Sequence, residues 1–165
     1  MRLLIAGFTA LLMSAADVPR PAPDLSYKLP DGRQINLGDY RGKVVAIEFL
    51  ITTCPHCQRC SQIMQKLYGE MGARGFQPLG VAINEMAHML VPDYVRDLKL
   101  TFPVGFSDRG TATGFLQHPE HLILSMPQVV FIDRKGVIRA QVGGADKFFL
   151  DEEKNMRAQL ESLLK

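Results

Sequence analysis

Two cysteines at the end of an apolar run could carry thiol chemistry. They stand in the sequence Cys54-Pro55-His56-Cys57, after the largely apolar and β-branched residues 44–53 and before the amphipathic residues 58–71. We therefore expect a strand to end and a helix to begin at this pair. Two thiols at this spacing can close a small disulfide ring. Unpaired N–H groups and the dipole of a helix start favour the thiolate, which is the nucleophilic form.

The elements that must position this pair follow from hydrophobic periodicity and turn residues. A β-hairpin is expected around Pro30-Asp31-Gly32, with arms at 25–27 and 34–37. Further strands are predicted at 44–51, 76–83, 102–106, 128–133 and 137–142. Helices are predicted from Pro55 to Met71 and at 93–98, 111–116 and 151–164. Strands alternating with helices, followed by a late hairpin, indicate an α/β mixed sheet with helices on both faces.

Size and composition fit one domain with a substantial core. The chain has 165 residues, of which 47% are hydrophobic and 22% are charged,. Its net charge is +2, with both signs interspersed. Because no basic run or stripe is present, nucleic-acid binding is not expected.

The N-terminus has the pattern of a signal peptide. Arg2 precedes an apolar stretch, residues 3–13, and Ser14-Ala15-Ala16 offers a small-residue cleavage site,. We expect residues 1–16 to be removed and residues 17–165 to form the domain, with no stable membrane insertion afterwards. An uncleaved anchor is the alternative. Either case predicts a bacterial extracytoplasmic location such as the periplasm, where disulfides persist.

The cysteines cluster instead of spreading along the chain. Cys54, Cys57 and Cys60 all lie within residues 54–60, so they suit chemistry better than the stapling of distant loops. A structural disulfide or half of a zinc site is the alternative for the first two. Cys60 follows the apolar stripe of the helix and is interpreted as a small buried side chain, or else as an alternative resolving thiol or metal ligand. His118 and His121 are surface loop residues or candidate metal ligands.

Several motifs together resemble a known family. They are Ala22-Pro23-Asp24, Asp31-Gly32, the sequence YRGKVV at 40–45, the Cys54–Cys57 motif, and MPQVVFIDRKG at 126–136. The chain is similar to exported thioredoxin-fold proteins of the TlpA/ResA type, a branch of the AhpC/TSA redoxins. The resemblance implies a thioredoxin-like mixed β-sheet flanked by helices, with an N-terminal β-hairpin. It also implies a thiol-disulfide oxidoreductase that serves cell redox homeostasis.

This resemblance implies roles for the cysteines and for a buried acid. Cys54 would be the exposed nucleophile that forms a mixed disulfide with a substrate, and Cys57 would resolve it. Glu48 stands at the position of the buried acid of thioredoxins, where family members often have Asn or Asp. There it could accept the Cys57 proton. The alternative for Glu48 is a glutamate at a sheet edge that reaches solvent. Thr53 also departs from the family pattern, because family members usually have an aromatic residue just before the first cysteine.

Other residues would modulate the site. Pro55 suits a first helical turn. The Pro-His dipeptide also occurs in strongly oxidising DsbA-type proteins, so His56 could stabilise the Cys54 thiolate; the alternative is a solvated histidine without effect. The resemblance implies that Pro127 is cis and packs against the disulfide. The Met126 backbone would then offer an edge to an extended substrate. The direction of electron flow stays open.

The expected partners are cysteine-containing exported proteins and a membrane or periplasmic thiol redox partner. No bound cofactor is required, because the disulfide itself is the redox group. One alternative is a peroxiredoxin, but Ile51 occupies the position three residues before the cysteine where that chemistry usually wants Thr. The other is a copper or metal chaperone that uses the three cysteines with His118 and His121.

Overall fold

The fold of the described residues is built on one eight-stranded sheet. The computed structural model describes residues 17–119 and 121–165, so the expected signal peptide, residues 1–16, lies outside the described residues. The strand order is β1-β8-β7-β4-β5-β6-β2-β3. The strands are β1 (Arg20–Pro21), β2 (Ser26–Lys28), β3 (Gln34–Asn36), β4 (Val44–Leu50), β5 (Phe76–Ala82), β6 (Val104–Phe106), β7 (Gln128–Ile132) and β8 (Val137–Gly143).

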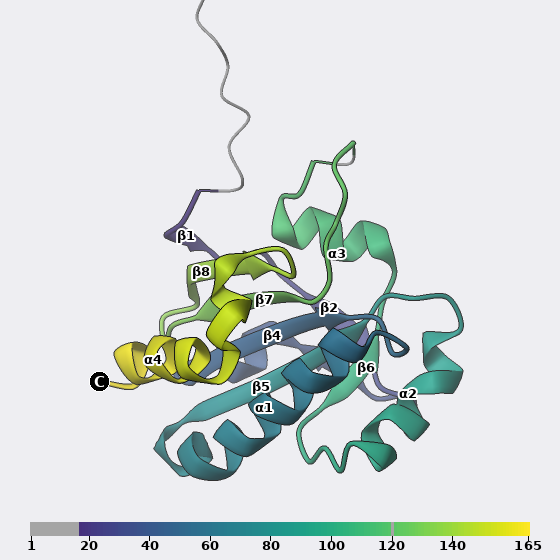
Figure 1. The fold of residues 1–165 in the computed structure, drawn as a ribbon, viewed down its shortest axis with the longest axis horizontal. Helices are drawn as coiled ribbons and strands as arrows, with labels where there is room; N and C mark the ends of the chain where they lie inside the picture. Colours follow the sequence, from purple (N-terminus) through teal and green to yellow (C-terminus); the bar gives the residue numbers. More distant parts are fainter. Residues whose placement is uncertain (1–16, 120) are drawn as a thin grey trace, which may run out of the picture.

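In the described part of the chain, four α-helices cover the two faces of this sheet. They are α1 (Pro55–Met71), α2 (Ala87–Asp97), α3 (Arg109–Leu116) and α4 (Glu152–Leu164), with short 3-10 helices at Leu37–Tyr40, Gly72–Arg74 and Lys147–Asp151. Helices α1 and α4 lie side by side on one face, and α3 lies on the opposite face (Figure 1). Within residues 17–119 and 121–165, no helix combines the length and apolar character needed to cross a membrane.

Strand β4 lies at the centre and leads directly to the cysteines. It runs parallel to β5 and antiparallel to β7, and all seven of its residues are buried. Successive side chains of a strand point to opposite faces. Ala46 and Leu50 therefore pack with α1 and α4, whereas Ile47 and Phe49 pack with α3. Glu48 lies on the α1 side together with Ala46 and Leu50.

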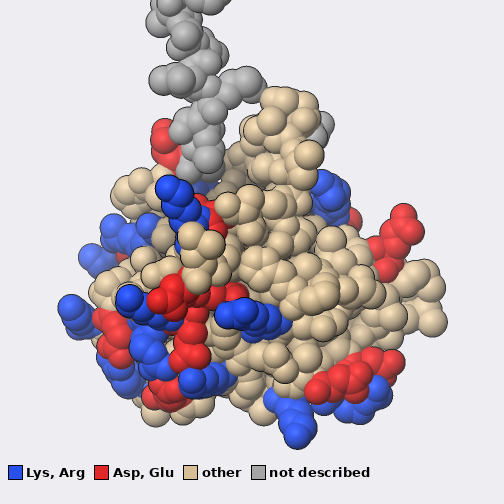
Figure 2. Space-filling view, in the orientation of Figure 1, with Lys and Arg blue, Asp and Glu red and all other residues tan. Residues whose placement is uncertain are grey.

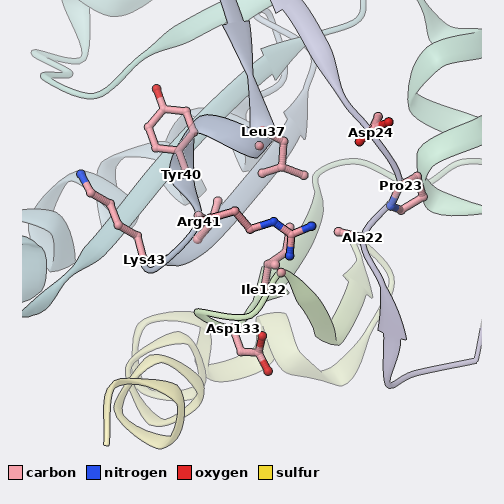
Figure 3. A pocket seen from close by; sticks show the side chains of 12 residues that line it. Ala22, Pro23, Asp24, Leu37, Tyr40, Arg41, Lys43, Ile132 and Asp133 are labelled. Atoms are coloured by element: carbon pink, nitrogen blue, oxygen red, sulfur yellow. The ribbon is translucent and has the colours of Figure 1, made fainter.

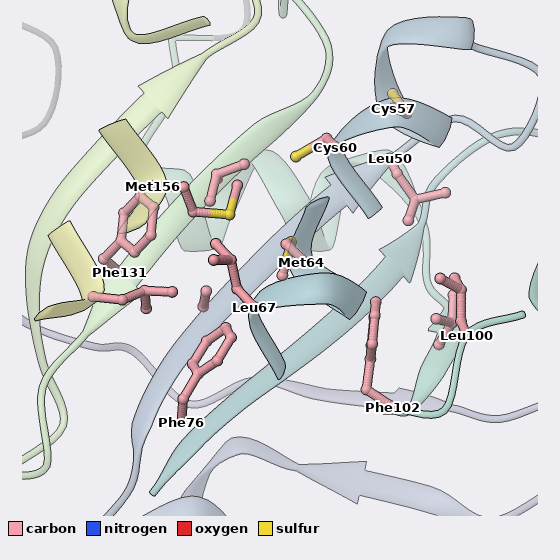
Figure 4. Close-up of a cluster of buried hydrophobic side chains, with 14 of the residues drawn as sticks. Leu50, Cys57, Cys60, Met64, Leu67, Phe76, Leu100, Phe102, Phe131 and Met156 are labelled. Atoms are coloured by element: carbon pink, nitrogen blue, oxygen red, sulfur yellow. The ribbon is translucent and has the colours of Figure 1, made fainter. Parts of the chain in front are cut away.

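The buried side of α1 forms much of the core on its face. The side chains that it buries are Cys57, Cys60, Ser61, Met64, Leu67 and Met71. They recur at helical spacing, which is the amphipathic pattern that the sequence indicated. Figure 4 shows Cys60, Met64 and Leu67 packed with Phe76 of β5 and Met156 of α4. The helix is therefore anchored along its length, and its first turn is held at the end of β4.

The predicted mixed sheet and the N-terminal hairpin of β2 and β3 are confirmed, with small shifts in the ends of elements. The bounds of one helix differ more from the prediction. We predicted a helix at 93–98 that follows Pro92, but α2 begins at Ala87 and contains Pro92. Ala87, Val91 and Tyr94 are buried together, and this packing outweighs the one N–H that proline removes,. The pairing of β1 with β8 was not predicted.

Candidate active site

Cys54 lies at the N-terminal cap of α1, between strand and helix. The Cys57 N–H donates to Cys54 Sγ at 3.4 Å, and Pro55 occupies the first turn. Cys54 is half-buried, whereas Cys57 has 0% exposure. All three cysteines are free thiols. The expected arrangement of an accessible first thiol and a buried second thiol is therefore present.

The turn before Cys54 is fixed by side chains from two other segments. Asn84 follows β5; its Oδ1 accepts from the Thr52 N–H at 3.0 Å and its Nδ2 donates to Thr52 Oγ1 at 3.1 Å. Gln58 Nε2 donates to the Thr52 carbonyl oxygen at 3.0 Å. The sequence analysis missed Asn84. Its signal was a polar residue just after a strand parallel to β4, because the carboxyl ends of parallel strands meet at one edge.

Cys57 lies in surroundings that disfavour its thiolate. Burial raises the pKa of Cys57 far above the ordinary thiol value, and the nearby Cys54 and Glu48 groups add to this effect. A thiol that attacks a disulfide must nevertheless lose its proton. Deprotonation of Cys57 is therefore assisted by a neighbouring group that accepts a proton.

Glu48 is a buried carboxyl group whose charge acts on Cys57. It has 0% exposure, so the alternative of a glutamate that reaches solvent is wrong. Burial raises its pKa well above the usual value, although a hydrogen bond from Ser61 Oγ to Glu48 Oε2, 2.5 Å long, opposes this shift. Ser61 Oγ also lies 2.8 Å from Tyr94 Oη, which is within 3.2 Å of the Cys57 carbonyl oxygen. A polar chain thus joins Glu48 to the backbone of Cys57.

The loop before β7 forms another side of the site. The Met126–Pro127 peptide bond is cis, as the resemblance implied, and Pro127 is buried. Met126 and Cys54 both pack against the core beneath α1. At Gly144, just after β8, a Cβ atom would lie 2.1 Å from the Met126 carbonyl oxygen. Only glycine permits this close approach, and the sequence analysis missed it.

His56 and Cys60 extend the site toward α4. The His56 ring meets Phe149 edge-on, with ring centroids 4.7 Å apart. Cys60 has 0% exposure, which agrees with its interpretation as a small buried side chain. Burial and the nearby carboxyl groups of Glu48 and Glu152 raise the Cys60 pKa. Glu152 itself, 1% exposed, was not identified from the sequence.

The two histidines considered as candidate metal ligands lie in the loop that follows α3. His118 Nε2 is 3.4 Å from the Leu122 carbonyl oxygen, and His121 is exposed. Within the described part of the chain, no three His, Cys, Asp or Glu side chains form a cluster suited to a metal ion. A separate pocket at the β7–β8 turn includes Tyr40, Arg41 and Asp133 in its lining, with the Arg41 guanidinium directed toward Ile132 (Figure 3). No cysteine lines that pocket.

The surface near the cysteines differs from the surface over α4. Charged side chains gather over α4 and the end of α1, where Lys66 pairs with Glu153 and Glu70 pairs with Arg157. The surface around the start of α1 is mostly uncharged (Figure 2). A weakly charged surface beside Cys54 suits contact with the backbone and apolar side chains of another protein.

Comparisons with known proteins agree with this architecture. A model of the AhpC/TSA family matches residues 18–141. Thiol-disulfide oxidoreductase ResA of Halalkalibacterium halodurans is 29% identical over 123 residues, which cover 74% of this chain and 66% of the relative. ResA of Oceanobacillus iheyensis is 30% identical over 128 residues, 75% of this chain and 64% of the relative. The match thus spans slightly less than two thirds of each relative.

A solved structure extends the likeness to the fold. The thiol:disulfide interchange protein, a thioredoxin family protein, from Chlorobium tepidum superposes with a TM-score of 0.75 at 23% identity. The superposition covers 92% of this chain and 100% of that one. The expected thioredoxin-like fold is therefore confirmed.

Proposed function

The chain belongs to the AhpC/TSA family, and we propose that it is a thiol-disulfide oxidoreductase whose redox group is the Cys54–Cys57 pair. The observation that carries this proposal is the arrangement of three groups at the end of β4. An accessible thiol caps α1, a buried thiol lies one turn later, and the buried carboxyl of Glu48 accepts a hydrogen bond from Ser61 of the same helix. Disulfide exchange requires a nucleophile, a resolving thiol and a proton acceptor, and these three groups can supply them.

The reaction proceeds through a mixed disulfide. The Cys54 thiolate attacks a substrate disulfide, a Cys54–substrate bond forms, and one substrate sulfur leaves as a thiolate. Cys57 then attacks Cys54 Sγ and transfers its proton to Glu48. The Cys54–Cys57 bond forms, the second substrate sulfur leaves with the electron pair, and the substrate is reduced by two electrons. The reverse sequence oxidises a substrate dithiol, and either direction is compatible with the same residues.

The Met126–Pro127 loop and His56 complete this proposal. The Met126 backbone precedes the cis peptide bond to Pro127 and would offer an N–H and a carbonyl group to an extended substrate segment, which could pair as an added strand,. His56, next to the nucleophile, increases the stability of the dithiol form when it is protonated, and so makes the disulfide more oxidising. Pro55 keeps the first turn of α1 in helical geometry.

The location and partners belong to the same proposal. Residues 1–16 act as a signal peptide, and residues 17–165 work in the periplasm or another extracytoplasmic compartment. The substrates are cysteine-containing exported proteins, and a membrane or periplasmic thiol protein restores the active redox state. The relatives named thiol-disulfide oxidoreductase support the protein-thiol part of this assignment.

Trapping of the mixed disulfide tests the proposed function. The Cys57→Ser variant keeps the nucleophile but lacks the resolving thiol, so it should accumulate a covalent adduct with a disulfide-bonded substrate such as insulin. The adduct is measured on non-reducing gels and by mass spectrometry. The matched Cys54→Ser variant should form none. Equal adduct formation in both variants, or an adduct through Cys60, would contradict the assigned roles.

A further inference from the structure

The peptide groups of Thr52 are held from two sides. Thr52 stands two residues before Cys54, in the turn between β4 and α1, and is 6% exposed. Its N–H donates to Asn84 Oδ1 at 3.0 Å, and its hydroxyl oxygen accepts from Asn84 Nδ2 at 3.1 Å. Its carbonyl oxygen accepts from Gln58 Nε2 at 3.0 Å. Each polar group of Thr52 is therefore paired with the side chain of a residue outside the turn.

The turn carries this hold to Cys54. The Cys54 N–H donates to the Ile51 carbonyl oxygen at 3.0 Å, which closes a hydrogen-bonded turn with Thr52 at its second position,. Cys54 then caps α1, and its Sγ accepts from the Cys57 N–H at 3.4 Å. A series of hydrogen bonds thus leads from Asn84 through the turn to the Cys54 sulfur. A shift of Thr52 would move that sulfur relative to Cys57.

Asn84 is itself fixed by its place between two strands and a helix. It follows β5, which runs parallel to β4 at its side (Figure 1). The Ile83 N–H donates to the Leu50 carbonyl oxygen at 3.0 Å, so the ends of the two strands stay joined. Asn84 Nδ2 also donates to the Glu85 carbonyl oxygen at 2.9 Å, and the Asn84 carbonyl oxygen accepts from the Ala87 N–H at 3.3 Å. The amide side chain is therefore a fixed bracket at this edge of the sheet.

The two steps of disulfide exchange differ in how much they depend on such a bracket. A buried N–H that loses its acceptor is costly, so without Asn84 the turn would reorganise to bring the Thr52 N–H to water. Attack of Cys57 on Cys54 is intramolecular, and a displacement of about 1 Å can slow such a step by about 10²-fold. Attack of Cys54 on a small disulfide in solution requires only access to its sulfur.

We propose that Asn84 is a positioning residue for disulfide exchange, which holds Cys54 where Cys57 can close the disulfide. This inference rests on the proposed function. In that step the Cys57 thiolate attacks Cys54 Sγ, the bond between the two cysteines forms, and the bond from Cys54 to the substrate sulfur breaks. That sulfur leaves with the electron pair, and the proton of Cys57 passes to Glu48. Asn84 touches none of the reacting atoms and acts through Thr52.

Comparison of two release steps tests this role. The reduced protein reacts with 5,5′-dithiobis(2-nitrobenzoate); Cys54 releases the first thionitrobenzoate in a bimolecular step, and Cys57 releases the second when it closes the disulfide. Asn84→Leu keeps a side chain of similar size but removes both contacts with Thr52. The second release per folded molecule should slow by about 10–10²-fold, whereas the first should change by less than about threefold. Stopped-flow absorbance measures both rates.

The conservative variant Asn84→Asp should restore the second release. Its carboxylate accepts from the Thr52 N–H, and the Thr52 hydroxyl can rotate to donate to the other carboxylate oxygen. The second release should therefore stay within about threefold of wild type. Asn36→Leu is the matched control, because Asn36 lies on the edge strand β3 and its side chain bonds to the exposed Asp39. This variant should keep both wild-type rates.

Two results would overturn the inference. One is a second release in Asn84→Leu that equals that of wild type per folded molecule, as a merely structural role of Asn84 predicts. The other is an equal slowing of both releases. If Asn84→Leu does not fold, Asn84→Ser, whose side chain is too short to keep both contacts with Thr52, decides by the same criterion. In these cases the wild-type protein still gives two releases and the proposed function stands. Failure of the wild-type protein to give a second release would instead contradict the proposed function itself.

Discussion

The two faces of the central sheet both hold a hydrophobic core, but they differ in where buried carboxyl groups lie. Beneath α1 and α4, Glu48 and Glu152 are buried beside apolar residues. Beneath α3, Phe49 and Phe115 pack in a cluster of aliphatic and aromatic residues from β4, β5, β7 and α3. Along β4 the side chains change face between Glu48 and Phe49. The alternation of one strand therefore places the proposed proton acceptor on one face and an apolar contact on the other.

The largest effect on the rate of disulfide exchange is expected from substitution of Glu48. Glu48→Gln keeps the shape of the side chain but removes the proposed proton acceptor for Cys57. When the reduced protein reacts with 5,5′-dithiobis(2-nitrobenzoate), Cys54 releases one thionitrobenzoate, and Cys57 releases a second when it attacks the mixed disulfide. In this variant the second release should slow by about 10²–10⁴-fold, which is typical for loss of a general base. Stopped-flow absorbance measures both releases. The first, which depends on Cys54, serves as the internal control, and an unchanged second release would remove Glu48 from the mechanism.

The opposite face should show the opposite result. Phe49→Ala leaves a cavity beside Phe115 and should lower the free energy of unfolding by about 3–5 kcal/mol,. Urea unfolding measures that loss. The exchange rate per folded molecule should stay within a factor of about two, since Phe49 faces away from the cysteines. A strong loss of exchange in the folded fraction would show that the two faces are not separable.

A smaller effect is expected at the rim of the site. A Cβ atom at Gly144 would collide with the Met126 carbonyl group. Gly144→Ala should cost about 1–3 kcal/mol of stability, as overpacking commonly does, and should weaken substrate binding more than the resolving step. Steady-state kinetics with a peptide disulfide would show a raised KM and a nearly constant second release. Gly114→Ala is the control, because a Cβ there meets nothing within 4 Å.

The smallest expected effect is a change in the free energy of unfolding with pH. The folded-state pKa of Glu48 is raised above its ordinary value of 4.5. The folded protein therefore binds this proton more tightly than the unfolded chain does. The stability from that proton is complete below pH 4.5 and is lost as pH rises through the raised pKa,. Urea unfolding across this range should show a shallower decline for Glu48→Gln, and parallel curves would contradict it.

Much of this arrangement could be predicted from local sequence patterns. The apolar run before Cys54 and the stripe after it predicted the strand–helix junction, and the resemblance to thioredoxins predicted that Glu48 is buried. Asn84, Gly144 and Glu152 could not be predicted in this way. Their roles depend on which distant segments pack together, and an acid at a helix start is commonly solvated. Helix α2 was misplaced because Pro92 was interpreted as a helix start.

The central claim is that Cys54 and Cys57, without Cys60, form the redox pair. It is tested most directly by equilibration of the protein in glutathione buffers, acid quenching, alkylation of free thiols and mass spectrometry of the peptides. We predict one two-electron transition, in which Cys54 and Cys57 become linked while Cys60 is alkylated at every potential after denaturation. A lack of any Cys54–Cys57 disulfide under oxidising conditions, or a disulfide that includes Cys60, would contradict this account.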